Sequence, residues 1–193
     1  MERQAKKKIL VLGIGNILWA DEGFGVRALE TFHARYVAPD NVTLLDGGTQ
    51  GLYLVQFVQE ADYLLVFDAI DYGLKPGALK IVQGDDVPKF TGAKKMSLHQ
   101  TGFQEVLSAA DLLGGFPEKL VLIGCQPLDL EDWGGPLTEP VRAQLALAAE
   151  AAAVVLEQWG APCRPRAPDE IAETLLGNDI DHIHYEKRLA AAG

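Results

Sequence analysis

The stretch Lys8-Ile-Leu-Val-Leu-Gly-Ile-Gly15 is almost entirely aliphatic, and a polar turn at Ala20-Asp21 follows it. A strand buried on both faces has such a continuous apolar run, whereas a strand with one wet face alternates. After the turn, apolar residues recur at helical spacing, which predicts a helix over residues 22–36. This stretch therefore predicts a buried strand and a helix, the opening unit of a parallel sheet.

The same alternation of strands and helices continues along the chain. Further strands are predicted at residues 42–45, 63–68 and 120–124, and helices at residues 52–60, 100–113 and 139–158. Only residues 69–77 separate the third strand from the next one, at 78–82, and a parallel crossover needs a longer connection. That strand is therefore expected to be antiparallel and at an edge.

These elements define the predicted fold class, which is α/β. We expect a single three-layer domain whose twisted, mostly parallel sheet has about five strands, one of them an antiparallel edge strand. Helices should cover both faces. The domain is expected to span residues 1–160. Residues 161–193, which contain Pro162, Pro165 and Pro168, are expected to form a mobile C-terminal tail.

Composition argues against several classes of partner. The chain of 193 residues has a net charge of −10 and no basic stripe, so nucleic acid is not an expected partner. No apolar run approaches the roughly 20 residues of a membrane span, and no secretory signal is present. The two cysteines, Cys125 and Cys163, imply no disulfide framework. We therefore expect a cytoplasmic protein.

Acidic residues follow three of the predicted strands. Glu22 comes after the first strand, and Asp46 and Asp68 end the second and third. Ligands of open α/β sheets bind beyond the carboxyl ends of the strands, and His99 joins this group if its loop folds over the same edge. Two carboxylates and an imidazole suit zinc, nickel or a similar divalent ion. Spacing alone leaves helix capping by the acids and a structural histidine open.

One alternative is dinucleotide binding, because Gly13-Ile-Gly15 follows a strand and Asp46 ends the next one. The third glycine of that fingerprint is replaced by Leu18. In addition, Asp21-Glu22 would repel a pyrophosphate at the start of the helix. We favour roles for Gly13 and Gly15 in a turn or a close backbone approach.

A second alternative is a cysteine nucleophile at Cys125 with His99 as its base. Buried strand cysteines are usually inert, which argues against it. No Gly-x-Ser-x-Gly elbow supports a serine hydrolase. His182-Ile-His184 could chelate a metal, but a solvated terminal segment is the favoured interpretation.

Four motifs in register resemble the nickel-iron hydrogenase maturation endopeptidases. They are Gly13-Ile-Gly-Asn-Ile-Leu-Trp-Ala-Asp-Glu-Gly-Phe-Gly25, Asp46-Gly-Gly-Thr49, Asp68-Ala-Ile-Asp71 and Ser97-Leu-His-Gln100. The resemblance covers residues 8–160 and is closest to the subgroup acting on uptake-type hydrogenases, which residues 43–53 and 94–105 also resemble. It implies an α/β fold, in agreement with the strand pattern.

The resemblance also implies a site. Glu22, Asp68 and His99 match the catalytic and metal-contacting positions of the family. Asp46 matches a position near the cleft, where substrate binding by Asp46, Gly47, Gly48 and Thr49 is expected. Gly47 and Gly48 could expose backbone amides to a substrate.

The implied activity is that of a hydrolase, a metal-dependent endopeptidase. Its partner would be the precursor of the hydrogenase large subunit, from which a C-terminal extension is cut after nickel insertion. The cofactor would be nickel, supplied by the substrate or bound by the enzyme, and zinc or cadmium could occupy the site in vitro. The alternative is a non-catalytic nickel-sensing chaperone of the precursor. Loops at residues 72–76 and 126–136 are candidates for partner recognition.

Overall fold

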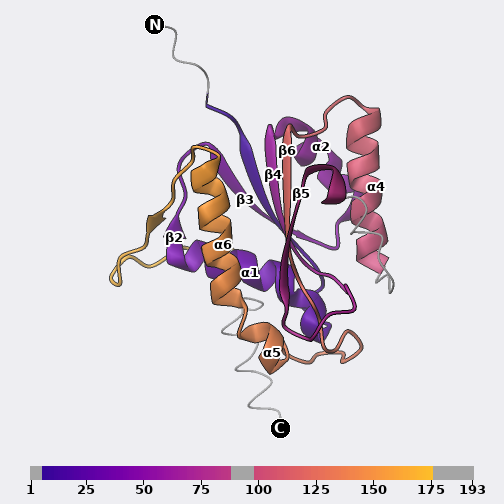
Figure 1. Ribbon diagram of the computed structural model, residues 1–193. Helices are drawn as coiled ribbons and strands as arrows, with labels where there is room; N and C mark the ends of the chain where they lie inside the picture. Colours follow the sequence, from indigo (N-terminus) through magenta and orange to yellow (C-terminus); the bar gives the residue numbers. More distant parts are fainter. Residues whose placement is uncertain (1–5, 88–97, 176–193) are drawn as a thin grey trace, which may run out of the picture.

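The computed structural model describes residues 6–87 and 98–175, without the side chains of residues 98–102. Its main sheet has five strands in the order β3-β1-β4-β6-β5 (Figure 1). β1, β3, β4 and β6 are parallel, and β5 pairs antiparallel with β6 at one edge. The strands are β1 (Ile9–Ile14), β3 (Val42–Gly48), β4 (Tyr63–Ala69), β5 (Leu79–Gln83) and β6 (Lys119–Cys125). The predicted sheet is thus confirmed, including its antiparallel edge strand.

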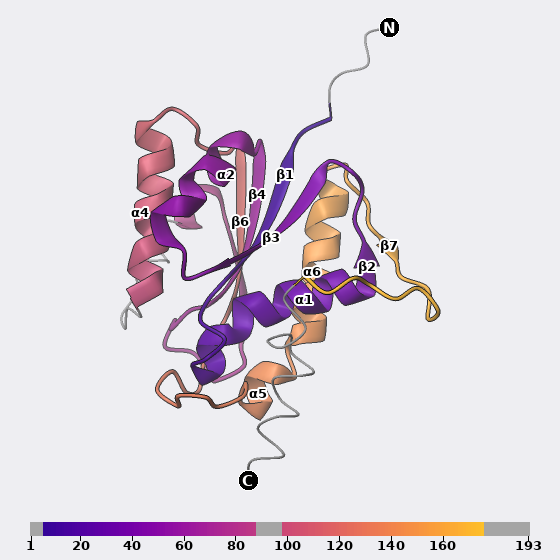
Figure 2. The same ribbon diagram turned by 180° about the vertical axis from the view of Figure 1, so that it is seen from behind.

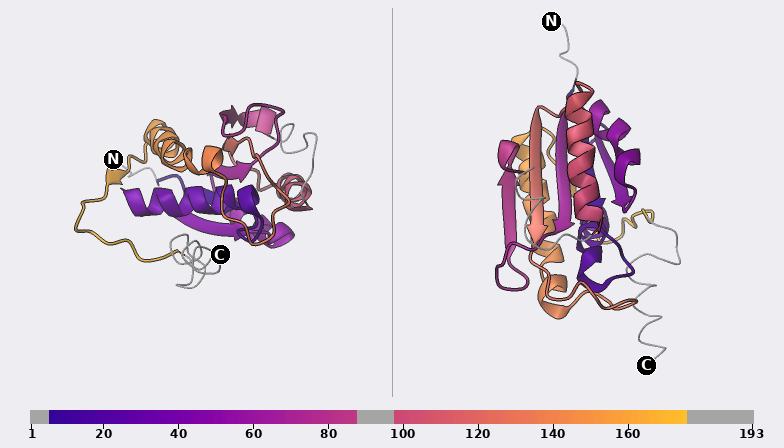
Figure 3. Two further views of the ribbon diagram at one scale, coloured as in Figure 1. Left: turned by 90° about the horizontal axis from the view of Figure 1, so that it is seen from below. Right: turned by 90° about the vertical axis from the view of Figure 1, so that its right-hand side faces the viewer.

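Helices cover both faces of this sheet, as predicted. α1 (Phe24–Arg35) and α6 (Leu145–Gln158) pack on one face, and α2 (Val55–Glu60) and α4 (Leu98–Leu112) on the other. In the right-hand view of Figure 3, α4 lies in front of the strands and α6 behind them. Alternate residues of β1 belong to the two cores, with Val11 facing α1 and Leu12 facing α2 and α4. Both side chains are fully buried, which explains the continuous aliphatic run.

Two predicted helices are interrupted. The helix expected over residues 22–36 begins as the 3-10 turn η1 (Ala20–Gly23), continues as α1 and ends where Tyr36 becomes extended. The helix expected over residues 139–158 consists of α5 (Glu139–Arg142) and α6. Between them the Gln144 N–H donates to the Val141 carbonyl at 3.0 Å, a tighter turn than an α-helix makes. Two further 3-10 turns are η2 (Gly51–Leu54) and η3 (Gly84–Asp86).

The segment after residue 160 makes specific contacts as far as residue 175. β7 (Arg164–Pro165) pairs antiparallel with β2 (Tyr36–Val37), and Figure 2 shows the two side by side. The Arg166 guanidinium donates to the carbonyls of His33 and Tyr36 at 3.1 and 3.4 Å. The expected mobility of residues 176–193, with the histidine pair they contain, lies outside the described residues. In the described part of the chain, no helix is long and apolar enough to cross a membrane.

Candidate active site

The order in which successive strands are added to the sheet reverses between β1 and β4. From β1 the chain proceeds through α1 to β3 on one side, and from β4 it proceeds to β5 and β6 on the other. Such a switch point is where open α/β sheets bind ligands. Gly13 of β1 lies in register with Asp46 on one side and Phe67, the neighbour of Asp68, on the other. Twice the strand spacing therefore separates the backbones of the two acids, about 10 Å.

Glu22 lies over the end of β1, the strand between β3 and β4. Its N–H donates to the Trp19 carbonyl at 2.8 Å within the turn that leads into η1. The turn folds so closely onto β1 that a Cβ on Gly15 would clash with the Glu22 carbonyl oxygen. Gly15 also has φ 137°, a conformation that favours glycine. The interpretation of Gly15 as a residue of close backbone approach is therefore confirmed.

The start of α1 is fixed by glycine in the same way. A Cβ on Gly13 would lie 2.7 Å from the Gly25 carbonyl oxygen, and a Cβ on Gly25 would clash with the carbonyls of Ile14 and Phe67. The helix therefore touches the backbones of β1 and β4 directly. These glycines leave little room for a dinucleotide between strand and helix, which weakens that alternative.

Asp68 is buried, with 1% of its surface exposed. It alternates along β4 with Leu64 and Val66, whose side chains lie in the core beneath α2 and α4. α4 begins at the same edge of the sheet, at the lower end in Figure 1, and His99 is its second residue. Asp68 and the start of α4 therefore share one face and one edge.

The side chain of His99, one of the three predicted metal ligands, is not among those that the structure describes. Among the side chains that the structure does describe, no three His, Cys, Asp or Glu residues are grouped as a metal site. The structure thus brings Glu22 and Asp68 to one switch point and leaves the triad itself as a prediction.

Asp46 lies on the opposite face of the sheet from Asp68. It alternates with Leu44, which packs against the core beneath α1, and the positive charge of Arg27 on α1 acts on its carboxylate. Burial raises the pKa of Asp46, opposed by the Gly48 N–H and by Arg27. The Gly48 N–H donates to Asp46 Oδ1 at 2.9 Å. The expected exposure of the Gly48 amide to a substrate is therefore wrong, because Asp46 occupies that donor.

The other two residues of this motif differ in exposure. Gly47 is buried, and a Cβ there would lie 2.8 Å from Leu12 Cδ1 in the core. Thr49 is exposed at the sheet edge. Of the four predicted substrate-binding residues, Thr49 and the half-buried Asp46 are the ones whose side chains a substrate can reach.

Tyr72, which the sequence placed only in a candidate recognition loop, lies close to Asp68. Its hydroxyl packs so closely on Gly124 of β6 that a Cβ there would clash with it. Burial, and next the negative charge of Asp68, raise the pKa of Tyr72, so the phenol stays protonated beside Asp68. The sequence signal for this proximity was its position directly after the Asp68–Asp71 motif.

Gln126 connects the two loops predicted to recognise the partner. Its Oε1 accepts hydrogen bonds from the N–H groups of Tyr72 and Leu74 at 2.8 and 3.1 Å. Its Nε2 donates to Asp71 Oδ1 at 3.0 Å. The two loops therefore form one surface beside Asp68.

Cys125 does not have the properties of a nucleophile. It is completely buried at the end of β6, and burial, followed by the charge of Asp21, raises the pKa of its thiol to about 12. A neutral, enclosed thiol attacks no substrate at neutral pH. This argues against the cysteine alternative.

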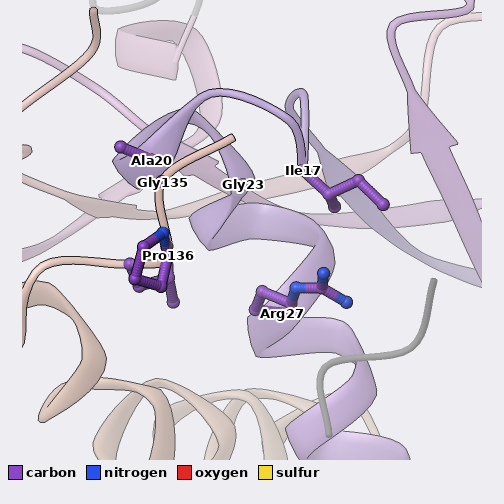
Figure 4. Close-up of a pocket in the computed structure, with 7 residues that line it drawn as sticks. Ile17, Ala20, Gly23, Arg27, Gly135 and Pro136 are labelled. Atoms are coloured by element: carbon purple, nitrogen blue, oxygen red, sulfur yellow. The ribbon is translucent and has the colours of Figure 1, made fainter. Parts of the chain in front are cut away.

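A small pocket opens beside the turn that carries Glu22 (Figure 4). Its volume of about 220 Å³ includes open solvent at its mouth, so little of it is enclosed. Arg27 contributes its one charged side chain and is itself held by Glu30 at 2.7 Å. The enclosed space is too small for a cofactor. It is lined by Ile17, Ala20, Gly23, Arg27, Gly135, Pro136 and Leu137.

The HycI family model, described as hydrogenase maturation protease, matches residues 26–155. The chain belongs to the hydrogenase maturation protease family. It is therefore a hydrolase, an endopeptidase, which confirms the family that the four motifs indicated.

Relatives of this maturation protease are similar over nearly their whole length. The hydrogenase expression/formation protein HupD of Bradyrhizobium diazoefficiens is 71% identical over 184 residues, covering 95% of this chain and 96% of that protein. The hydrogenase 2 maturation protease of Escherichia coli is 43% identical over 161 residues, covering 82% and 96%. The solved structure of the hydrogenase maturating endopeptidase HybD from E. coli has a TM-score of 0.78 at 41% identity and covers 82% of this chain and 98% of that one.

Proposed function

We propose that this maturation protease removes the C-terminal extension of the large-subunit precursor of a nickel-iron hydrogenase, after nickel has been inserted. The observation that carries the proposal is the position of Glu22 just beyond β1 and of Asp68 near the end of β4, the two strands that border the switch point. His99 begins the helix at that edge. A relative named hydrogenase 2 maturation protease, 43% identical, supports the choice of a hydrogenase as the protein served.

The proposed residues fit a nickel ion by their chemistry. Glu22 and Asp68 offer carboxylate oxygens and His99 an imidazole nitrogen, a mixed set that nickel and zinc accept. Three protein ligands leave positions open for groups of the precursor. Zinc or cadmium would occupy the same donors in vitro. A metal held there would supply Lewis-acid polarisation of the scissile carbonyl or a more acidic bound water.

In this proposal the chain's own residues position the precursor. Asp68, buried on β4, and the backbone of Glu22, packed against Gly15, are in place before the substrate arrives. A nickel ion carried by the precursor would therefore be gripped at one place, with the scissile bond beside it. This explains why nickel insertion would have to precede cleavage.

Asp46 is proposed to position substrate rather than bind metal. Its carboxylate lies on the α1 face and interacts with Arg27, whereas Asp68 lies on the α4 face. With Thr49, the exposed residue of the same motif, Asp46 would hold the extension on that side, whereas Gly47 and Gly48 shape the turn that places these two side chains. We place the reaction in the cytoplasm, where reduced cysteines such as the free Cys125 and Cys163 are the rule.

The test is incubation of the purified protein with nickel-loaded and with nickel-free precursor, followed by mass spectrometry of both products. Release of a C-terminal peptide from the loaded precursor alone is the expected result. Cleavage of both forms would contradict the nickel requirement. Binding without any change in mass would instead favour the nickel-sensing chaperone.

A further inference from the structure

Two loops beside Glu22 expose large apolar side chains. Leu18 precedes η1, and Leu128 and Trp133 lie in the loop that follows β6; they are 37%, 58% and 62% exposed. We call residues 16–19 and 128–134 together the platform. Soluble proteins rarely gather exposed apolar side chains at one place unless the place is a contact surface.

The platform is held together by its own contacts. The rings of Trp19 and Trp133 pack edge to face with centroids 4.9 Å apart, and the two residues form an isolated antiparallel bridge. The Gly134 N–H donates to the Leu18 carbonyl at 2.7 Å. The exposed ring of Trp133 is therefore already ordered, and a partner that covers it loses little conformational entropy.

Asp21 anchors the platform next to the site. Its carboxylate is fully buried and accepts hydrogen bonds from the N–H groups of Leu128, Asp129 and Thr138 at 2.8, 3.0 and 2.7 Å. The Asp21 N–H in turn donates to the Asp129 carbonyl at 3.1 Å. Because Glu22 is the next residue, the platform and the proposed metal ligand belong to one rigid unit.

The ionisable side chains of the two platform segments are all acidic. Residues 16–23 and 126–138 contain neither Lys nor Arg, whereas Glu131 and Asp132 directly precede Trp133 in the sequence. Asp129 Oδ1 accepts the N–H groups of both, which fixes the turn that presents them. A surface of this kind complements a partner segment with apolar and basic side chains.

We propose that the platform docks the polypeptide of the precursor itself, with an apolar side chain on Trp133 and Leu18 and basic side chains facing Glu131 and Asp132. The inference rests on the proposed function, since a substrate gripped at Glu22 must pass over the neighbouring turn. The Glu22 N–H donates to the carbonyl of Trp19, the last residue of the first platform segment, so the platform lies within one turn of the proposed ligand Glu22.

The test compares Trp133→Ala and Glu131→Lys with wild type and with Leu112→Ala. Leu112 is 87% exposed and lies at the far end of α4, so this control removes an apolar side chain away from the site. Binding of nickel-loaded precursor and steady-state cleavage are measured at two salt concentrations. Trp133→Ala should weaken binding and raise KM about tenfold or more, the size typical of an aromatic anchor, with kcat unchanged.

Glu131→Lys should weaken binding at low salt and lose most of its effect at high salt, because exposed charges are screened. Trp133→Phe should restore most of the affinity lost in Trp133→Ala. Leu112→Ala should match wild type in every measurement.

The outcomes separate this inference from the proposed function. If wild type cleaves and Trp133→Ala binds and cleaves with the same constants, the platform is not the docking surface. A fall in kcat at unchanged KM would also overturn it, because Trp133 would then act on the reaction and not on binding. If wild type binds the precursor through Trp133 and cuts nothing, the docking surface stands and the protease proposal fails.

Discussion

Gly15 and Glu22 are in direct backbone contact at the edge of the sheet. A Cβ on Gly15 would clash with the carbonyl oxygen of Glu22, and the φ of Gly15 is 137°. The residue that follows the last position of β1 therefore sets the height of the turn that carries the proposed metal ligand. A change at Gly15 has to displace Glu22 or distort the strand.

Gly15→Ala should therefore lower both stability and processing. The unfavourable φ alone costs about 1–2 kcal/mol, and the backbone clash adds to it. Gly84→Ala is the matched control, because Gly84 also has a positive φ (57°) but no atom within 4 Å of the added Cβ. Urea unfolding should show both losses, whereas cleavage of precursor should fall only for Gly15→Ala. Equal cleavage by the two variants would contradict the positional role of Gly15.

Replacing the proposed ligands by their neutral isosteres should abolish processing without unfolding the chain. Glu22→Gln and Asp68→Asn keep the side-chain volume and remove the negative charge that a cation requires. We expect cleavage to fall at least about a hundredfold. Glu157→Gln, an exposed acid on α6, is the control. His99→Ala should behave like the two isosteres, and normal cleavage by any of the three variants would remove that residue from the site.

The sequence predicted the strands because they carry the strongest pattern. The aliphatic runs of β1, β4 and β6 are buried on both faces, so neither exposure nor a partner strand was needed to recognise them. The two-residue strands β2 and β7 carry no such pattern. They form only because the chain returns past the end of α1 after residue 160, and this long-range contact leaves no local pattern in the sequence.

The sheet-edge rule predicted that three acids lie at the carboxyl edge of the sheet, but not the face on which each side chain lies. A continuous apolar strand has no polar alternation, so the sequence did not reveal that Asp46 and Asp68 lie on opposite faces. Nor did it reveal the structural role of Asp21, which is next to Glu22. Asp21 proves to be a buried anchor of the loop after β6, and only the loop, which is distant in sequence, reveals this.

Cys125 should be unreactive in the folded protein. Because burial raises the pKa of Cys125 to about 12 from its ordinary value of 9.0, folding favours the neutral thiol. This contribution to stability is fully present below pH 9 and is lost as pH rises through about 12. A thiol reagent at pH 8 should label Cys125 only after unfolding, and Cys125→Ala should still process precursor. Rapid labelling of native Cys125, or loss of cleavage in the variant, would revive the cysteine nucleophile.

The segment after residue 160 should stabilise the domain through Arg166. Its guanidinium and its N–H donate to the carbonyls of His33, Arg35 and Tyr36, and His33 Nε2 in turn contacts the Glu173 carbonyl at 2.8 Å. A chain ending at residue 160 loses these bonds and also lacks Ala161, so the core side chains that Ala161 covers become exposed. A chain ending at residue 175 keeps both.

We therefore expect Arg166→Ala and the chain ending at residue 160 to lose about 1–3 kcal/mol of unfolding free energy, while the chain ending at residue 175 stays close to wild type. Arg164→Ala is the matched control, because Arg164 pairs with Glu170 on the surface and such exposed pairs contribute little. Thermal unfolding and precursor cleavage should be measured on all four variants. Similar midpoints for Arg166→Ala and Arg164→Ala would show that the return of the chain past α1 does not stabilise the fold.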